Sequence, residues 1–186
     1  MKSSINKDLK CSSCGASLNV SSVVVSRGNP NADLMIIGEA PGAIEQEIGE
    51  PFLGRSGKLL DLLLNQVGID PDREVYICNV IKCKPLKNRR PTKAEIKRNK
   101  PWLLQQIKLV NPLIIVLAGS TALEAVLGIK KGISAIRGTW QSWEGRLVMP
   151  LFHPSYLLRN PSKKDGAPTS LTLSDLLQVS EKLKNP

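Results

Sequence analysis

Four short apolar runs recur along the chain and predict buried β-strands. Each run is bounded by polar or turn-forming residues and is rich in Ile, Val and Leu, which is typical of strands that are covered on both faces. The second run also carries the β-branched and aromatic residues that favour strands. The four runs are residues 32–40 (ADLMIIGEA), 74–83 (EVYICNVIKC), 113–119 (LIIVLAG) and 146–152 (RLVMPLF).

Between these runs, apolar residues at helical spacing predict helices. Thr92 and Glu95 form a capping box for one helix, and Pro101 is expected to end that helix and begin another. Thr121 and Glu124 have the same spacing and are expected to cap a further helix. The predicted helices are residues 56–69, 94–99, 102–110, 122–128 and 169–184.

The alternation of strands and helices predicts an α/β fold. A length of 186 residues is enough for one domain with a substantial core. We expect a three-layer α/β/α sandwich around a central four-stranded, mainly parallel sheet. The single domain should span residues 1–186, with residues 1–20 forming an N-terminal segment that carries a Cys-x2-Cys pair.

Basic residues outnumber acidic ones, with 26 Lys and Arg against 16 Asp and Glu and a formal net charge of +10. Such an excess favours a polyanionic partner such as nucleic acid, because binding phosphates releases condensed counterions. The segment 1–10 (MKSSINKDLK) lacks the apolar stretch of a secretory signal, and no apolar run approaches the ~20 residues of a membrane span. We therefore expect a protein that is neither secreted nor membrane-bound, located in the cytoplasm with the nucleoid DNA.

Three of the predicted strands end in polar residues. The first runs into GEAPG, which contains Glu39, and the second carries Asn79. The fourth runs into His153, the only histidine in the chain, followed by Pro154 and Ser155. Ligands of open α/β sheets bind beyond the carboxyl ends of the strands. Glu39, Asn79 and His153 are therefore expected to meet in one crevice.

Four segments together resemble the type-4 (iron–sulfur) uracil-DNA glycosylases of the uracil-DNA glycosylase superfamily. The resemblance extends from about Cys11 to the C-terminal helix, and it implies a hydrolase that flips uracil out of DNA and cleaves its N-glycosidic bond. The abasic site that remains is an intermediate of base excision repair. The implied partner is uracil-containing DNA, single- or double-stranded, bound by a monomer. The segments are residues 38–60 (GEAPGAIEQEIGEPFLGRSGKLL), 79–83 (NVIKC), 88–92 (NRRPT) and 152–159 (FHPSYLLR).

The resemblance also implies roles for the pocket residues. His153 would donate a hydrogen bond to uracil O2 as negative charge develops there, and Asn79 would read O4 and N3–H. Phe52 would stack on the flipped base. The Glu39 carboxylate would stabilise the sugar cation or orient water. The backbone around the base would come from Glu39, Ala40 and Pro41.

Further residues are implied to hold the DNA. Gly54 and Ser56 would let backbone amides approach phosphate, and Pro154 and Ser155 would form a phosphate pinch. Leu157 would fill the space vacated in the base stack. The arginines implied as phosphate contacts are Arg89, Arg90 and Arg159.

The cysteines fit the family only in part. Cys11, Cys14 and Cys83 match three ligands of its [4Fe–4S] cluster, but the fourth position is Asn99. Cys78 is a poor substitute, because five residues of extended strand place it ~16 Å from Cys83 and on the opposite face. The site therefore holds a cluster on three cysteines and another group, a zinc ion, or no metal. A neutral amide is a poor ligand for soft metals, which favours a lost or labile cluster.

Two alternative functions follow from the departures from the family. The missing cysteine, together with Gln46 where the family usually has Asp, is compatible with a uracil- or DNA-binding protein of the same fold with little catalysis. A zinc-binding nucleic-acid module would account for the cysteines, but it leaves the His153-Pro154-Ser155 motif unexplained.

Overall fold

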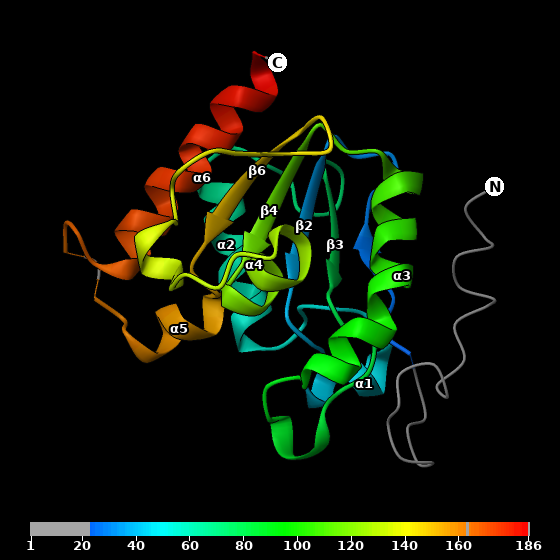
Figure 1. Ribbon diagram of the computed structural model, residues 1–186. Helices are drawn as coiled ribbons and strands as arrows, with labels where there is room; N and C mark the ends of the chain where they lie inside the picture. The colour runs from blue at the N-terminus through cyan, green and yellow to red at the C-terminus, as the bar shows by residue number, and fades with distance from the viewer. Residues whose placement is uncertain (1–22, 163, 186) are drawn as a thin grey trace.

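Four parallel strands form the centre of a six-stranded sheet in the computed structural model, which describes residues 23–162 and 164–185 (Figure 1). The predicted α/β fold and its four central strands are confirmed. The sheet has two additional short strands, β1 (Arg27–Gly28) and β5 (Gln141–Trp143), which pair antiparallel at its two edges. The order is β1-β3-β2-β4-β6-β5. The central strands are β2 (Leu34–Gly38), β3 (Val75–Asn79), β4 (Ile114–Ala118) and β6 (Arg146–Leu151).

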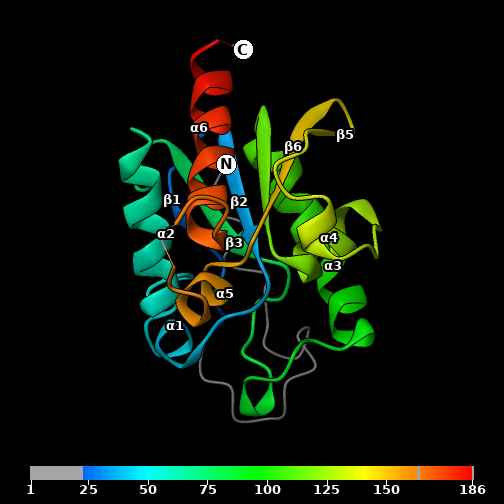
Figure 2. The ribbon, with the colours of Figure 1, turned by 90° about the vertical axis from the view of Figure 1, so that its left-hand side faces the viewer.

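Helices cover both faces of the sheet (Figure 2). Side chains alternate along each strand, so that Ile36 packs in the cluster with α2, α5 and α6 while Ile37 packs in the cluster with α3 and α4. This burial on both sides explains why the central strands are continuous apolar runs. The helices are α1 (Ala43–Ile48), α2 (Arg55–Gln66), α3 (Lys93–Val110), α4 (Ser120–Leu127), α5 (Pro154–Arg159) and α6 (Pro168–Lys184), with 3₁₀ turns at Leu86–Asn88 and Ile133–Ala135.

Two predictions about helix ends are wrong, and one is confirmed. Thr92 and Glu95 form the expected capping box at the start of α3. Pro101, however, does not divide that helix, because it lies on the exposed side, where water can hydrate the carbonyl group that loses its hydrogen bond. α4 begins without a side-chain cap after Gly119, and the Thr121 side chain takes part in a long-range contact instead.

The parallel strands all end on the same side of the sheet, and the loops that follow them gather there (Figure 1). This edge carries the residues that follow β2, β3 and β6, so the topology brings together segments that are far apart in sequence. Across residues 23–162 and 164–185, no helix has both the length and the apolar character that a membrane crossing requires.

Candidate active site

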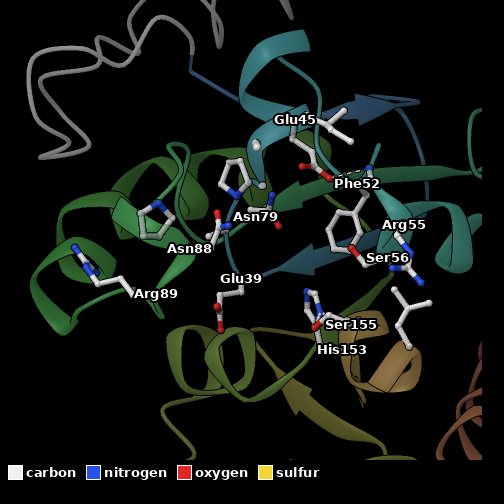
Figure 3. A pocket seen from close by; sticks show the side chains of 18 residues that line it. Glu39, Glu45, Phe52, Arg55, Ser56, Asn79, Asn88, Arg89, His153 and Ser155 are labelled. Carbon is white, nitrogen blue, oxygen red and sulfur yellow. Dashed lines mark hydrogen bonds between the residues drawn. The ribbon is translucent and has the colours of Figure 1, made fainter. Parts of the chain in front are cut away.

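A pocket of about 450 Å³ opens at the carboxyl ends of the central strands (Figure 3). Its walls come from the ends of β2, β3 and β6, the segment between α1 and α2, and the loop that follows β3. Asn88 and Arg89 of that loop also line it, which the sequence did not predict. The residues predicted to surround a base all line this pocket, namely Glu39, Ala40, Pro41, Phe52, Asn79 and His153.

Phe52 forms one wall of the pocket because two glycines make room for it. Its φ is 57°, which is uncommon for a bulky residue. A Cβ atom at Gly57 would lie 1.7 Å from the Phe52 carbonyl oxygen, and one at Gly38 would lie 2.4 Å from the ring and 2.5 Å from Asn79 Oδ1. The ring is 5% exposed, and its centroid lies 5.9 Å from that of His153. Glycine is therefore required at both positions if Phe52 and Asn79 are to share the pocket.

His153 is held in one tautomer by the start of α5. The backbone N–H of Ser155 donates a hydrogen bond to His153 Nδ1 at 3.2 Å, and Ser155 Oγ lies 2.8 Å from the same atom. Because Nδ1 accepts, the proton of the neutral ring is on Nε2. Burial, together with the positive charge of Arg159, lowers the pKa of His153 to about 4. The site therefore presents a neutral Nε2–H donor at neutral pH.

Asn79 ends β3 and is 2% exposed. The fully buried Lys82 donates from Nζ to the Asn79 carbonyl oxygen at 2.6 Å, and burial lowers the pKa of this ammonium group. The contact ties the loop after β3 to the end of the strand. Sequence reasoning missed Lys82, because nothing in the sequence indicates that a lysine lies inside.

Glu45 links the two halves of the long glycine-rich segment. This side chain from α1 is 7% exposed, and its Oε1 accepts the backbone N–H of Gly54 at 2.9 Å (Figure 3). The expectation that the Gly54 amide faces phosphate is therefore wrong, since that N–H is already bonded. The N–H groups of residues 55–57 have no acceptor within α2, so Ser56 keeps its predicted place beside a phosphate site.

The structure moves the expected wedge residue. Leu157 is 1% exposed and packs in the core with α2 and α6, so it cannot fill a gap in the DNA stack. The next residue, Leu158, is partly exposed and lines the pocket. Pro154 is buried as the first residue of α5, and Ser155 is bonded to His153; their role as a phosphate pinch stays a prediction.

The three candidate phosphate arginines differ in their contacts. Arg89 forms two hydrogen bonds with the Glu95 carboxylate, at 2.7 and 2.8 Å. Arg90 donates to Thr121 Oγ1 at 3.0 Å and lies 3.4 Å from the Glu124 carboxylate. Arg159 is exposed at the end of α5. Of the three, Arg159 is best placed to contact phosphate.

The proposed metal ligands are only partly visible. Cys11 and Cys14 lie outside the described residues. Asn99 is 1% exposed, and both ends of its amide bond the backbone: Oδ1 accepts from Lys82 N at 3.1 Å, and Nδ2 donates to Glu95 O at 2.9 Å. Within residues 23–162 and 164–185, no group of three or more His, Cys, Asp or Glu side chains is placed to hold a metal. A cluster with four thiolate ligands therefore does not fit at Asn99.

The remaining cysteines of the described chain are buried. Cys83 is 3% exposed, in the loop that Asn99 ties to α3. Cys78 is fully buried in β3 among the side chains that pack against α3 and α4, and burial raises the pKa of its thiol. This position in the core explains its presence without a metal.

Comparison with known proteins agrees with the arrangement of the pocket. A family model described as the uracil DNA glycosylase superfamily matches residues 25–177. The type-4 uracil-DNA glycosylase of Thermotoga maritima is 46% identical over 157 residues, which cover 83% of this chain and 81% of that protein. The type-4 uracil-DNA glycosylase of Saccharolobus solfataricus is 36% identical over 160 residues, 82% of this chain and 74% of that protein. The Sulfurisphaera tokodaii protein of the same name is 35% identical over 164 residues, 83% and 74% of the two chains.

Proposed function

The chain belongs to the uracil DNA glycosylase superfamily, and we propose that the pocket described above removes uracil from DNA. The type-4 relatives support a hydrolytic uracil-DNA glycosylase that acts in base excision repair. The observation that carries the proposal is the meeting of Phe52, Asn79 and His153 with Glu39 around one pocket. A base inside a duplex cannot reach such a pocket, so the deoxyuridine must flip out of the stack.

His153 stabilises the leaving group. Hydrolysis breaks the bond between C1′ and N1, and the electron pair moves onto the uracil ring while the sugar becomes a cation. Nε2–H donates to O2, where negative charge accumulates, and no proton needs to leave the ring. Water then bonds to C1′ and releases its proton to solvent. The Glu39 carboxylate lies at the edge of the same pocket and stabilises the sugar cation or orients the water.

Asn79 and Phe52 select and hold the base. The Asn79 amide donates to O4 and accepts from N3–H, a pattern that cytosine reverses. The Phe52 ring stacks on the flipped base, which contributes about 1–3 kcal/mol in comparable stacks. The backbone around Ala40 and Pro41 encloses the remaining edge.

The DNA strand crosses the face on which the pocket opens. Ser56, at the start of α2, and the exposed Arg159 contact phosphate, and Leu158 takes the wedge role that the buried Leu157 cannot fill. Single- and double-stranded DNA that contains uracil are both substrates, since flipping is needed only in a stack. All pocket residues come from one chain, which supports a monomer acting on the nucleoid DNA in the cytoplasm.

The metal site is incomplete relative to a four-cysteine cluster. Cys11, Cys14 and Cys83 supply three thiolates, and Asn99 in the fourth position uses its amide to join the loop after β3 to α3. The proposal is that a [4Fe–4S] cluster is lost or labile here and that zinc, if bound, has no part in the reaction. Analysis of iron, sulfide and zinc in protein purified without oxygen tests this.

The activity is tested by incubating the full chain with a labelled single-stranded oligonucleotide that contains one deoxyuridine. Free uracil, with strand cleavage after alkali, is the expected result. An oligonucleotide with cytosine at the same position is the matched control and should remain intact. Tight binding to the uracil strand without cleavage would instead favour a binding protein, and equimolar zinc without uracil recognition would favour a zinc module.

A further inference from the structure

Glu39 is held by a residue that the described mechanism does not use. One carboxylate oxygen, Oε2, accepts a hydrogen bond from Thr121 Oγ1 at 2.5 Å. Thr121 lies in the first turn of α4, immediately after the end of β4, and is 1% exposed. The contact joins residues 82 positions apart in the sequence. A buried hydroxyl group therefore reaches the catalytic carboxylate from the neighbouring strand.

The direction of this hydrogen bond is fixed by Arg90. Its Nε donates to the same Thr121 Oγ1 at 3.0 Å, and its guanidinium group also lies 3.4 Å from the Glu124 carboxylate. A guanidinium group only donates hydrogen bonds, so the hydroxyl must accept from Arg90. Its single proton is then directed to Glu39. The four side chains form one chain of contacts from Glu124 through Arg90 and Thr121 to Glu39.

We infer that Thr121 is a positioning residue for the Glu39 carboxylate and that Arg90 sets the orientation of the Thr121 hydroxyl. Among the described residues, Oε2 is the only oxygen of Glu39 with a side-chain hydrogen bond. The bond fixes one oxygen and leaves Oε1 to serve the sugar cation or the water. This inference rests on the role proposed for Glu39. It also explains why Thr121 and Glu124, which have the spacing of a capping box, do not cap α4.

The inference predicts a loss of rate rather than of DNA affinity. A hydrogen bond to a charged group, once removed, corresponds to about a 10- to 100-fold change. Thr121→Val keeps the shape of the side chain and removes the hydroxyl, so kcat should fall by this factor while KM stays nearly constant. Thr121→Ser keeps the hydroxyl and should recover most of the rate. Arg90→Gln, at an exposed position, should lower kcat by about 3- to 10-fold.

A double-mutant cycle separates positioning from a general structural effect. If Thr121 acts through Glu39, adding Thr121→Val to Glu39→Gln should cause little further loss of excision rate. Thr172→Val is the matched control, since Thr172 is also buried and its hydroxyl donates to the Pro168 carbonyl oxygen in α6, remote from the pocket. This control should keep the wild-type excision rate, and melting temperatures of all variants show whether each one folds.

The outcomes distinguish the inference from the function on which it rests. A wild-type chain that releases no uracil refutes the proposed function itself. An active wild type whose Thr121→Val variant keeps the full rate refutes the role of Thr121, as do losses that multiply in the double variant. Should Thr121→Val fail to fold, Arg90→Gln decides: a normal melting temperature with reduced kcat supports the relay, and an unchanged kcat overturns it.

Discussion

Protonation of His153 should switch the enzyme off, and at an unusually low pH. The folded protein lowers the pKa of this side chain from 6.5 to about 4. At pH 5.5 a pKa of about 4 leaves roughly 30 neutral rings for each protonated one, whereas a pKa of 6.5 would leave about one in ten neutral. Acidification from pH 7.5 to 5.5 should therefore reduce kcat/KM by only about 5%, against about tenfold for an unshifted histidine.

The measurement is kcat/KM for uracil excision across this range, because that ratio reports the groups of the free enzyme. The chain contains one histidine, so NMR titration of the imidazole resonances gives the pKa directly and without ambiguity. The two methods should agree on a midpoint near 4. A midpoint near 6.5, or a rate that rises as the pH falls, would refute the neutral Nε2–H donor.

The same shift affects stability, with a definite sign. The pKa is lower in the folded than in the unfolded chain, so the unfolded state takes up the proton first as the pH falls below 6.5. The free energy of unfolding should then decrease by up to about 3 kcal/mol between pH 6.5 and 4. Denaturant melts of wild type and His153→Gln should differ by this component, and parallel pH dependences would contradict it.

Three substitutions test other parts of the account. Asn79→Asp replaces the donor to O4 by a second acceptor, so uracil excision should fall about 100-fold or more; an unchanged rate in the oligonucleotide assay would exclude Asn79 from base recognition. Gly38→Ala places a Cβ atom 2.4 Å from the Phe52 ring, and it should abolish excision and binding of a uracil strand in a fluorescence titration. Glu95→Ala removes the α3 capping box and the ion pair with Arg89, so calorimetry should show about 1 kcal/mol less stability. Because the pKa of Glu95 is lowered to about 2, its contribution should persist above pH 4.5 and disappear toward pH 2.

The sequence predicts the centre of the fold because the central strands are buried on both faces and therefore stand out as apolar runs. The edge strands β1 and β5 are two and three residues long, too short for any periodicity to appear. Pro101 shows a second limit: whether a proline breaks a helix depends on which side of the helix faces water, and tertiary packing decides that.

The same distinction applies to the pocket. Glu39, Asn79 and His153 follow predicted strands, so their convergence follows from the parallel topology. Thr121 was assigned to a helix cap because its local spacing allows this, whereas its partner Glu39 is distant in sequence. Leu157 was assigned to the DNA because of its distance from His153, but the helical turn of α5 directs it into the core. Contacts between distant segments decide such cases, and local patterns do not contain them.

The central claim, that a neutral His153 holds the departing uracil, is tested most directly by single-turnover excision with wild type and His153→Ala. Both proteins are incubated in excess over a single-stranded oligonucleotide with one deoxyuridine, at neutral pH, and the abasic product is cleaved with alkali. Removal of a donor of this kind costs about 100- to 1,000-fold in rate, and the account predicts a loss of that size with uracil-strand binding retained. A His153→Ala variant that excises uracil at the wild-type rate would contradict it.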